Sequence, residues 1–248
     1  MLKKPAIHVP ESTSRAPQSV AAADGGESVQ LLSVLVYELP VRLWHWVSAA
    51  AIVVLSVTGY WIGDPLPTQP GEASASYLMG YIRFAHFAAG YLLAVAFVGR
   101  FYWAFVGNKQ SHEMFTLPVF SAKYWRGLVA MFKWYGFMSA EPQHFAGHNP
   151  LARTSMVLGY SLLTVVMCCT GFALYGEGTQ AGSWASRAFG WVFDLCGSSQ
   201  NVHTLHHLGM WAMVIFVIAH IYAVIRDDVV GPHSTVSSMI SGRRAFKE

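Results

Sequence analysis

Four histidines lie inside long apolar stretches of this sequence, where an ionisable side chain is costly. They are His45, His86, His206 and His220. Ionisable residues at membrane depth are rare, and by default they indicate a functional site. An imidazole can donate and accept hydrogen bonds, take up a proton or bind a metal. We therefore treat these four side chains as the candidate chemistry of the chain.

His206 and His220 are fourteen residues apart in one apolar stretch. At about 100° per residue, fourteen steps end roughly 40° short of four full turns, so both side chains lie on nearly the same helix face. The rise along the helix separates them by about 21 Å. His207 points roughly to the opposite side, and His203 lies about 100° away. His206 is therefore the better candidate within this histidine-rich segment.

The alternating direction of the apolar stretches assigns a partner to each of these two histidines. His45 lies near the start of the first stretch, and His86 lies in the first half of the second. Matching by depth predicts the pairs His86–His206 and His45–His220. Two axial imidazoles suit a low-spin haem iron that transfers electrons, because no iron position stays open for a substrate. The sequence has no CxxCH motif, so two non-covalent b-type haems are expected, and no residue is assigned a catalytic role.

Other interpretations of these residues stay open from the sequence alone. The histidines could form hydrogen bonds between helices, whereas zinc requires four ligands at one point and these lie at two depths. Arg83 and Arg100 are candidates to pair with haem propionates, or residues that snorkel to the interface. Glycines at the levels of the histidines leave room for a haem or for close helix packing: Gly59, Gly90, Gly159 and Gly171.

Four stretches, at about residues 43–62, 77–106, 151–175 and 203–225, are long and apolar enough to cross a membrane. Of the 248 residues, 54% are hydrophobic and only 12% are charged, and the mean hydropathy is +0.37. A soluble domain has about 25% charged residues, so the composition excludes an ordinary soluble enzyme and a disordered chain. We predict an all-α integral membrane protein, a four-transmembrane-helix bundle.

Positive charges gather on one side of the predicted spans. All sixteen Lys and Arg except Arg83 and Arg187 precede or open the first span, lie at or between the facing ends of the second and third, or follow the fourth. By the positive-inside rule, we expect both termini of the multi-pass chain to lie in the cytoplasm. The expected location is the cell's inner membrane.

Three further segments complete the predicted organisation. Residues 118–140 mix aromatic residues with Lys and Arg, which predicts an amphipathic helix in the cytoplasmic loop at the membrane interface; a solvated loop is the alternative. Residues 1–35 show no signal-peptide pattern and predict a disordered cytoplasmic tail. A dihaem domain over residues 36–230 then precedes a cytoplasmic C-terminal tail over residues 231–248.

Eight blocks of the sequence resemble the b-type cytochrome subunit of membrane-bound, quinone-reducing nickel–iron hydrogenases. The resemblance extends from about residue 36 to the end. Its blocks are YELPVRLWHW (37–46), GEASASYLMGYIRFAHF (71–87), RFYWAFVGN (100–108), GHNPLAR (147–153), TGFALYGEG (170–178), HTLHHLGMW (203–211), HIYAVIRDD (220–228) and SMISGRRAFK (238–247).

This resemblance implies four transmembrane helices and b-type haem bound by histidines of helices one, two and four, here His45, His86, His206 and His220. It implies an anchor for the hydrogenase small and large subunits on the outer face. Electrons would pass from an iron–sulfur cluster of the small subunit to the outer haem, and from the inner haem to a quinone. The chain would not activate hydrogen itself; membrane lipids would surround it, and nucleic acid is not an expected partner.

The quinone site should lie near the inner haem, where the block GHNPLAR enters the third span. His148 and Asn149 are therefore candidates to bond a quinone carbonyl. Asn149 followed by Pro150 is also a helix-start signal, with Asn at the N-cap and Pro at the first helical position.

Two other classes of function were weighed against this one. A cytochrome b of a formate dehydrogenase, or a quinol–ferric reductase, would keep the haems and change the partner. A haem-free transporter or assembly factor would bind no haem, and the sequence lacks the paired broken helices of inverted-repeat transporters.

Overall fold

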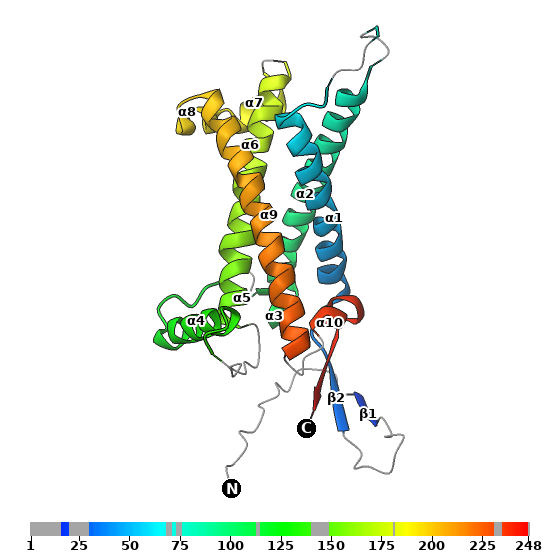
Figure 1. Ribbon diagram of the computed structural model, residues 1–248, viewed down its shortest axis with the longest axis vertical. Coiled ribbons are helices and arrows are strands. Elements are labelled where there is room, and N and C mark those ends of the chain that lie inside the picture. The colour runs from blue at the N-terminus through cyan, green and yellow to red at the C-terminus, as the bar shows by residue number, and fades with distance from the viewer. Residues whose placement is uncertain are drawn as a thin grey trace. The chain divides into compact units, whose positions relative to one another are not determined.

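Four long helices dominate the computed structural model, which describes residues 16–19, 30–67, 71–72, 76–112, 115–139, 149–180, 182–230 and 235–247 (Figure 1). Each of the four is long and apolar enough to cross a membrane, which confirms the predicted spans. They are α1 (Leu39–Gly63), α2 (Leu78–Val106), the run formed by α5 (Pro150–Thr154), π-helical η3 (Ser155–Leu162) and α6 (Leu163–Gly178), and α9 (Ser199–Val230).

The predicted span limits differ from the helix ends by a few residues, most clearly at the start of α9. This helix begins at Ser199 rather than at residue 203. The Ser198 hydroxyl accepts a hydrogen bond from the Asn201 N–H at 3.2 Å, which caps the helix one turn earlier. Gly197 adopts a left-handed conformation, with φ of 79°, and ends the preceding helix.

The chain divides into two compact units. The first, called here the core unit, comprises Leu43–Tyr102 and Leu158–Ile218; the second, the end unit, comprises Met1–Arg42, Trp103–Val157 and Ala219–Glu248. Within the core unit the helices approach closely at glycines. A Cβ at Gly59 of α1 would contact Met210 of α9, and a Cβ at Gly209 would clash with the Met167 sulfur of α6. Small residues thus let these helices pack as a bundle.

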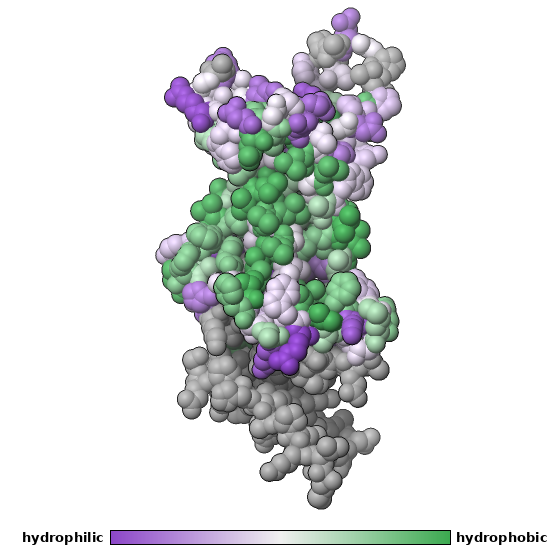
Figure 2. All heavy atoms as spheres, turned by 90° about the vertical axis from the view of Figure 1, so that its left-hand side faces the viewer, coloured by the Kyte–Doolittle hydropathy of each residue, from purple (hydrophilic) through white to green (hydrophobic). Residues whose placement is uncertain are grey.

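Large apolar side chains cover the outside of the core unit. Phe84, Val95 and Ile215 are 72%, 70% and 66% exposed. Figure 2 shows hydrophobic residues over the middle of the long helices, and hydrophilic residues gathered at the end where α7 and α8 lie in Figure 1. Such an apolar exterior is stable only against lipid, so it supports the membrane-spanning assignment.

Two short helices of the core unit, α7 (Trp184–Phe189) and α8 (Trp191–Cys196), fold back against α6. Ala173, Val192 and Val202 form a buried apolar cluster among α6, α8 and α9. Ser183 caps α7, because its hydroxyl accepts a hydrogen bond from the Ser186 N–H at 3.3 Å. This packing fixes the ends of α6 and α9 at one end of the bundle.

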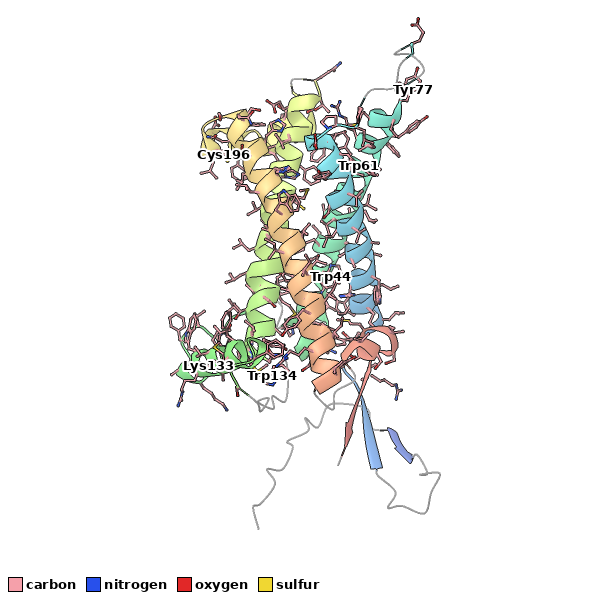
Figure 3. All side chains as sticks on the ribbon, viewed as in Figure 1. Trp44, Trp61, Tyr77, Lys133, Trp134 and Cys196 are labelled. Carbon is pink, nitrogen blue, oxygen red and sulfur yellow. The ribbon has the colours of Figure 1, made fainter. Side chains whose placement is uncertain are left out.

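The predicted amphipathic helix is present in the end unit as α4 (Ala122–Tyr135), with Ser121 at its N-cap. Lys133 and Trp134 are adjacent in sequence and lie on different faces of α4 (Figure 3). Trp134 is only 2% exposed. Arg226 of α9 donates to the Trp134 carbonyl at 2.9 Å and stacks over the Trp134 and Phe137 rings. An arginine at a helix C-terminus stabilises its last carbonyls, so α4 is tied to the end of α9.

A small antiparallel sheet also lies in the end unit. Strand β2 (Gln30–Leu35) pairs with β1 (Ala16–Ser19) and with β3 (Arg243–Lys247). These segments belong to the two predicted tails, and the pairing of β2 with β3 does not follow from any pattern in the sequence. The end unit also contains α3 (Lys109–His112) and α10 (Thr235–Ser241), and Gly242 follows α10 with φ of 80°.

Replacement of Gly176 by Ala should destabilise the packing of α7 on α6. A Cβ at Gly176 would lie 2.6 Å from the backbone nitrogen of Ser186, and backbone cannot move aside as a flexible side chain can. We expect a loss of about 1–3 kcal/mol in unfolding free energy. Thermal denaturation in detergent measures it. Gly178→Ala is the matched control, because nothing lies within 4 Å of its added Cβ; equal stability of both variants would contradict this packing.

Candidate functional site

The rings of His86 and His206 lie next to each other, edge to face, within the core unit. His86 projects from α2 and His206 from α9, and their ring centres are 6.4 Å apart with an interplanar angle of 73°. This is the outer pair that the sequence predicted by depth. The two side chains come from positions far apart in the chain, so the packing of the helices alone brings them together.

Thr58 of α1 fixes the orientation and tautomer of His86. The Thr58 hydroxyl donates to the Val54 carbonyl at 2.6 Å, a common bond for threonine in a helix. The same oxygen lies 2.9 Å from Nδ1 of His86. A hydroxyl has one proton, and here it is directed to the carbonyl, so the oxygen must accept from Nδ1–H. His86 is therefore held with its proton on Nδ1.

Thr170 of α6 holds His206 in the same way. Its hydroxyl donates to the Val166 carbonyl at 2.8 Å, and its oxygen lies 2.8 Å from Nδ1 of His206. Thr58 and Thr170 are 7% and 2% exposed, so water has little access to either bond. Both imidazoles thus have the proton on Nδ1 and a lone pair on Nε2.

Neutral imidazoles with free Nε2 lone pairs are suited to bind one metal atom between them. Imidazole nitrogens bind metals at about 2 Å, so two rings that share a metal atom have centres roughly 6 Å apart. The observed separation of 6.4 Å fits this arrangement. A hydrogen bond from the second ring nitrogen is the usual way in which proteins orient a metal-binding histidine.

Glycines next to both threonines give the imidazoles their space. A Cβ at Gly59 would lie 3.2 Å from Cε1 of His86, and a Cβ at Gly171 would lie 3.1 Å from Cε1 of His206. Any larger side chain would push the rings from these positions. A Thr-Gly dipeptide therefore occurs twice, on α1 and on α6. In each, the threonine accepts a hydrogen bond from the histidine, and the glycine leaves space for the imidazole ring.

The sequence also matches a known protein family. Residues 36–242 match the family described as prokaryotic cytochrome b561. The chain belongs to this family.

Several curated proteins are similar to the chain over most of its length. A protein of Cupriavidus necator is 57% identical over 227 residues, which are 92% of each chain. A protein of Azotobacter chroococcum is 54% identical over 232 residues, covering 93% of this chain and 97% of the relative. Both are named "Probable Ni/Fe-hydrogenase B-type cytochrome subunit". A relative in Escherichia coli K12, with a similar name, is 42% identical over 225 residues.

Membership of a b-type cytochrome family agrees with the two-histidine arrangement rather than with zinc. Among the residues that the structure describes, no three His, Cys, Asp or Glu side chains gather in a group that could hold a metal ion. Haem requires only two axial side chains, because the porphyrin supplies the other iron ligands. The residues present therefore fit a b-type haem at His86 and His206.

The neighbouring histidines of this cytochrome b561 chain have other contacts. The exposed His207 accepts a hydrogen bond at Nε2 from the Trp211 indole at 3.1 Å. His203 lies 3.7 Å from a carboxylate oxygen of Glu177. The preference for His206 as the haem ligand within the doublet stays a prediction.

The other predicted haem residues occupy the described helices as follows. His45 lies on α1, two turns from its start, and His220 lies on α9, fourteen residues after His206. The two belong to different units, and their pairing stays a prediction. Arg83 is exposed on α2, whereas Arg100 is only 4% exposed.

Of the two quinone candidates, His148 lies outside the described residues. Asn149 caps α5, because its side-chain oxygen accepts from the Ala152 N–H at 2.7 Å. Its amide nitrogen lies 3.5 Å from the Tyr135 hydroxyl. Asn149 thus caps α5 through its side-chain oxygen, while its side-chain N–H group is directed toward the Tyr135 hydroxyl.

Sequence reasoning missed Thr58 and Thr170. A threonine in an apolar span is usually read as a packing residue, and only its contacts show which way its proton points. The repeated Thr-Gly dipeptide at residues 58–59 and 170–171 is the signal that could have located both.

Replacement of Thr170 by Val should weaken haem retention at the outer pair. The side chain keeps its shape but no longer accepts the His206 Nδ1 proton, and loss of such a bond typically lowers affinity about 10–100-fold. Haem per chain after dilution in detergent measures the effect. Thr204→Val is the control, because Thr204 makes the same type of bond to the Gln200 carbonyl and is exposed. Equal haem loss in both variants would contradict the orienting role.

Proposed function

We propose that the chain is the membrane anchor and electron-transfer subunit of a quinone-reducing nickel–iron hydrogenase. His86 and His206 would hold an outer b-type haem, and His45 and His220 would hold an inner one. The two haems would supply one-electron carriers between the hydrogenase on the outer, periplasmic face and the quinone pool. The chain activates no hydrogen, and its own chemistry is to hold the electron carriers and to bind quinone.

The observation that carries this proposal is the neighbouring pair His86 and His206, with each Nδ1 proton accepted by a threonine. Two filled axial positions suit electron transfer and leave no iron position for a substrate. When bound, haem supplies a one-electron carrier inside the membrane. The protein contributes the ligand orientation, the low-dielectric surroundings and the exclusion of water, all of which tune such a carrier.

Helix geometry supports the inner haem. His220 lies on nearly the same face of α9 as His206, about 21 Å further along the axis. His45 lies on α1 thirteen residues before Thr58, the residue that holds His86. Each proposed pair is therefore made from helices that cross the membrane, at separate depths.

The names of the relatives support the hydrogenase partner over the other partners weighed above, because three of them describe hydrogenase subunits. His86 is eight residues from the start of α2, or about 12 Å along the axis. This depth supports a route by which a donor bound at that end of the bundle would reach an outer haem. The distribution of Lys and Arg supports an inner-membrane location with both termini in the cytoplasm.

At the cytoplasmic end, Asn149 and Tyr135 are our candidates to bind the quinone, with His148. Burial and the negative charge of Asp227 raise the pKa of the Tyr135 hydroxyl. The hydroxyl therefore stays a hydrogen-bond donor throughout the physiological pH range. An amide and a hydroxyl donor together suit a carbonyl oxygen of a quinone.

His206→Ala should remove the outer haem and stop hydrogen-driven quinone reduction by the complex. His207→Ala is the matched control, because His207 contacts Trp211 rather than His86. We expect haem per chain, counted as the pyridine haemochrome, to fall by about half in His206→Ala and to stay unchanged in His207→Ala. The reverse result would overturn the outer ligand pair. Purification without a nickel-containing partner, with quinol-driven reduction of ferric chelates, would overturn the hydrogenase assignment.

Asn149→Ser separates the capping role of Asn149 from its proposed role toward quinone. Serine also caps helices, so stability should change by less than about 0.5 kcal/mol. The amide donor is lost, so the KM for quinone should rise several-fold while the haem content stays constant. Steady-state quinone reduction by the complex measures both parameters. An unchanged KM would show that Asn149 only caps α5.

A further inference from the structure

Helix α4 of the end unit has one buried face, formed by Tyr124, Gly127, Met131 and Trp134. At about 100° per residue, these four residues lie on one side of the helix. Two groups of exposed side chains share the remaining surface, one apolar and one basic, and neither group has a role in the proposed function. Their arrangement indicates what α4 binds.

Hydrogen bonds fix α4 beside the ends of two membrane-spanning helices. The hydroxyls of Tyr124 and of Thr154 on α5 are hydrogen-bonded to each other. The Tyr222 hydroxyl of α9 donates to the Tyr135 carbonyl at 2.8 Å, and the Arg226 bond described above holds the same end of α4. Figure 1 shows α4 lying crosswise to α5 and to the last turns of α9, all within the end unit. Because both spans end here, α4 is held at the level of a membrane interface.

The exposed apolar side chains of α4 form one stripe along the helix. Trp125, Val129 and Phe132, called here the apolar stripe, are 50%, 53% and 65% exposed. Their spacing of four and three residues places them within roughly 60° of one another around the helix axis. Ile221 and Ile225, on the α9 span in the same unit, are exposed to a similar degree. The end unit therefore presents apolar surface to lipid on α9 and a further apolar stripe on α4.

Exposed basic side chains lie next to the apolar stripe. Arg126 and Lys133, called here the basic pair, are both exposed. They are seven residues apart, so they lie on nearly the same helix face, about 10 Å apart along the axis. This face is roughly 80° from the centre of the apolar stripe, and Lys123 lies roughly 70° beyond it. The exposed surface of α4 thus changes from apolar to basic within a quarter of a turn.

The positive charge of this segment is not balanced by its own sequence. Residues 115–139 contain three Lys and Arg and no Asp or Glu. Asp227 of α9 acts on Tyr135, which lies on the side of α4 opposite to the basic pair. The basic pair therefore attracts an anion, and the apolar stripe beside it requires an apolar cover. A molecule with an anionic head and apolar chains satisfies both, whereas an acidic protein or a nucleic acid matches only the basic pair.

We propose that α4 binds anionic phospholipids of the membrane that surrounds the chain. The basic pair, with Lys123 beside it, binds the phosphate groups, and the apolar stripe lies among the acyl chains. Basic amphipathic helices bind anionic lipid surfaces in this way, and each Lys or Arg near the surface strengthens the binding. The inference goes beyond the proposed function, because it requires no haem, quinone or hydrogenase partner.

Native mass spectrometry of the full chain in detergent tests this inference, with phosphatidylglycerol and phosphatidylcholine of identical acyl chains as the probes. The wild-type chain should bind phosphatidylglycerol more tightly than phosphatidylcholine. The double variant Arg126→Gln/Lys133→Gln should weaken phosphatidylglycerol binding about fivefold for each charge removed and leave phosphatidylcholine binding unchanged. Phe132→Ser interrupts the apolar stripe, so it should weaken the binding of both lipids.

Arg187→Gln/Arg243→Gln is the matched control, because it removes the same charge from exposed side chains outside α4. It should bind phosphatidylglycerol as the wild-type chain does. Equal weakening in the two double variants would overturn the inference, because the lipid would then respond to net charge alone. Equal wild-type affinity for the two lipids would also overturn it and leave an acidic protein as the partner of the basic pair. The proposed function is unaffected by either result, since haem content and quinone reduction test it separately.

Discussion

The hydrogen bond that each of two buried threonine hydroxyls donates determines what the core unit of this protein can bind. Thr58 and Thr170 each donate to the carbonyl one turn earlier in their own helix. Each oxygen can then only accept from the histidine that faces it, which places the imidazole proton on Nδ1. Two neutral rings, each with a lone pair on Nε2, follow from this constraint, and such rings are suited to bind one metal atom within the core unit.

The packing of the four long helices keeps these threonines and histidines in contact. The two threonines lie on α1 and α6, and the two histidines on α2 and α9, so all four long helices contribute to one site. Glycine follows each threonine because a Cβ there would meet the imidazole ring. The site thus depends on close helix approach, which only small residues permit inside a membrane.

The main elements could be predicted from the sequence because they depend on length, apolar character and helical spacing. The four spans, the amphipathic helix α4 and the cap at Asn149 are of this kind. The family also follows from motifs in the sequence. The contact of Thr58 with His86 could not be predicted, since it depends on the rotation of a helix and on which neighbour the side chain reaches. Likewise, the pairing of β2 with β3 joins segments from opposite ends of the chain, and no local sequence pattern predicts it.

The most direct test of the two-histidine arrangement is the low-temperature electron paramagnetic resonance spectrum of the oxidised, purified chain. Iron with two imidazole ligands gives a low-spin ferric signal. The arrangement predicts low-spin haem, with the component from the outer pair altered in Thr170→Val because the His206 Nδ1 proton loses its acceptor. A high-spin ferric signal, or no haem signal in the intact chain, would contradict it.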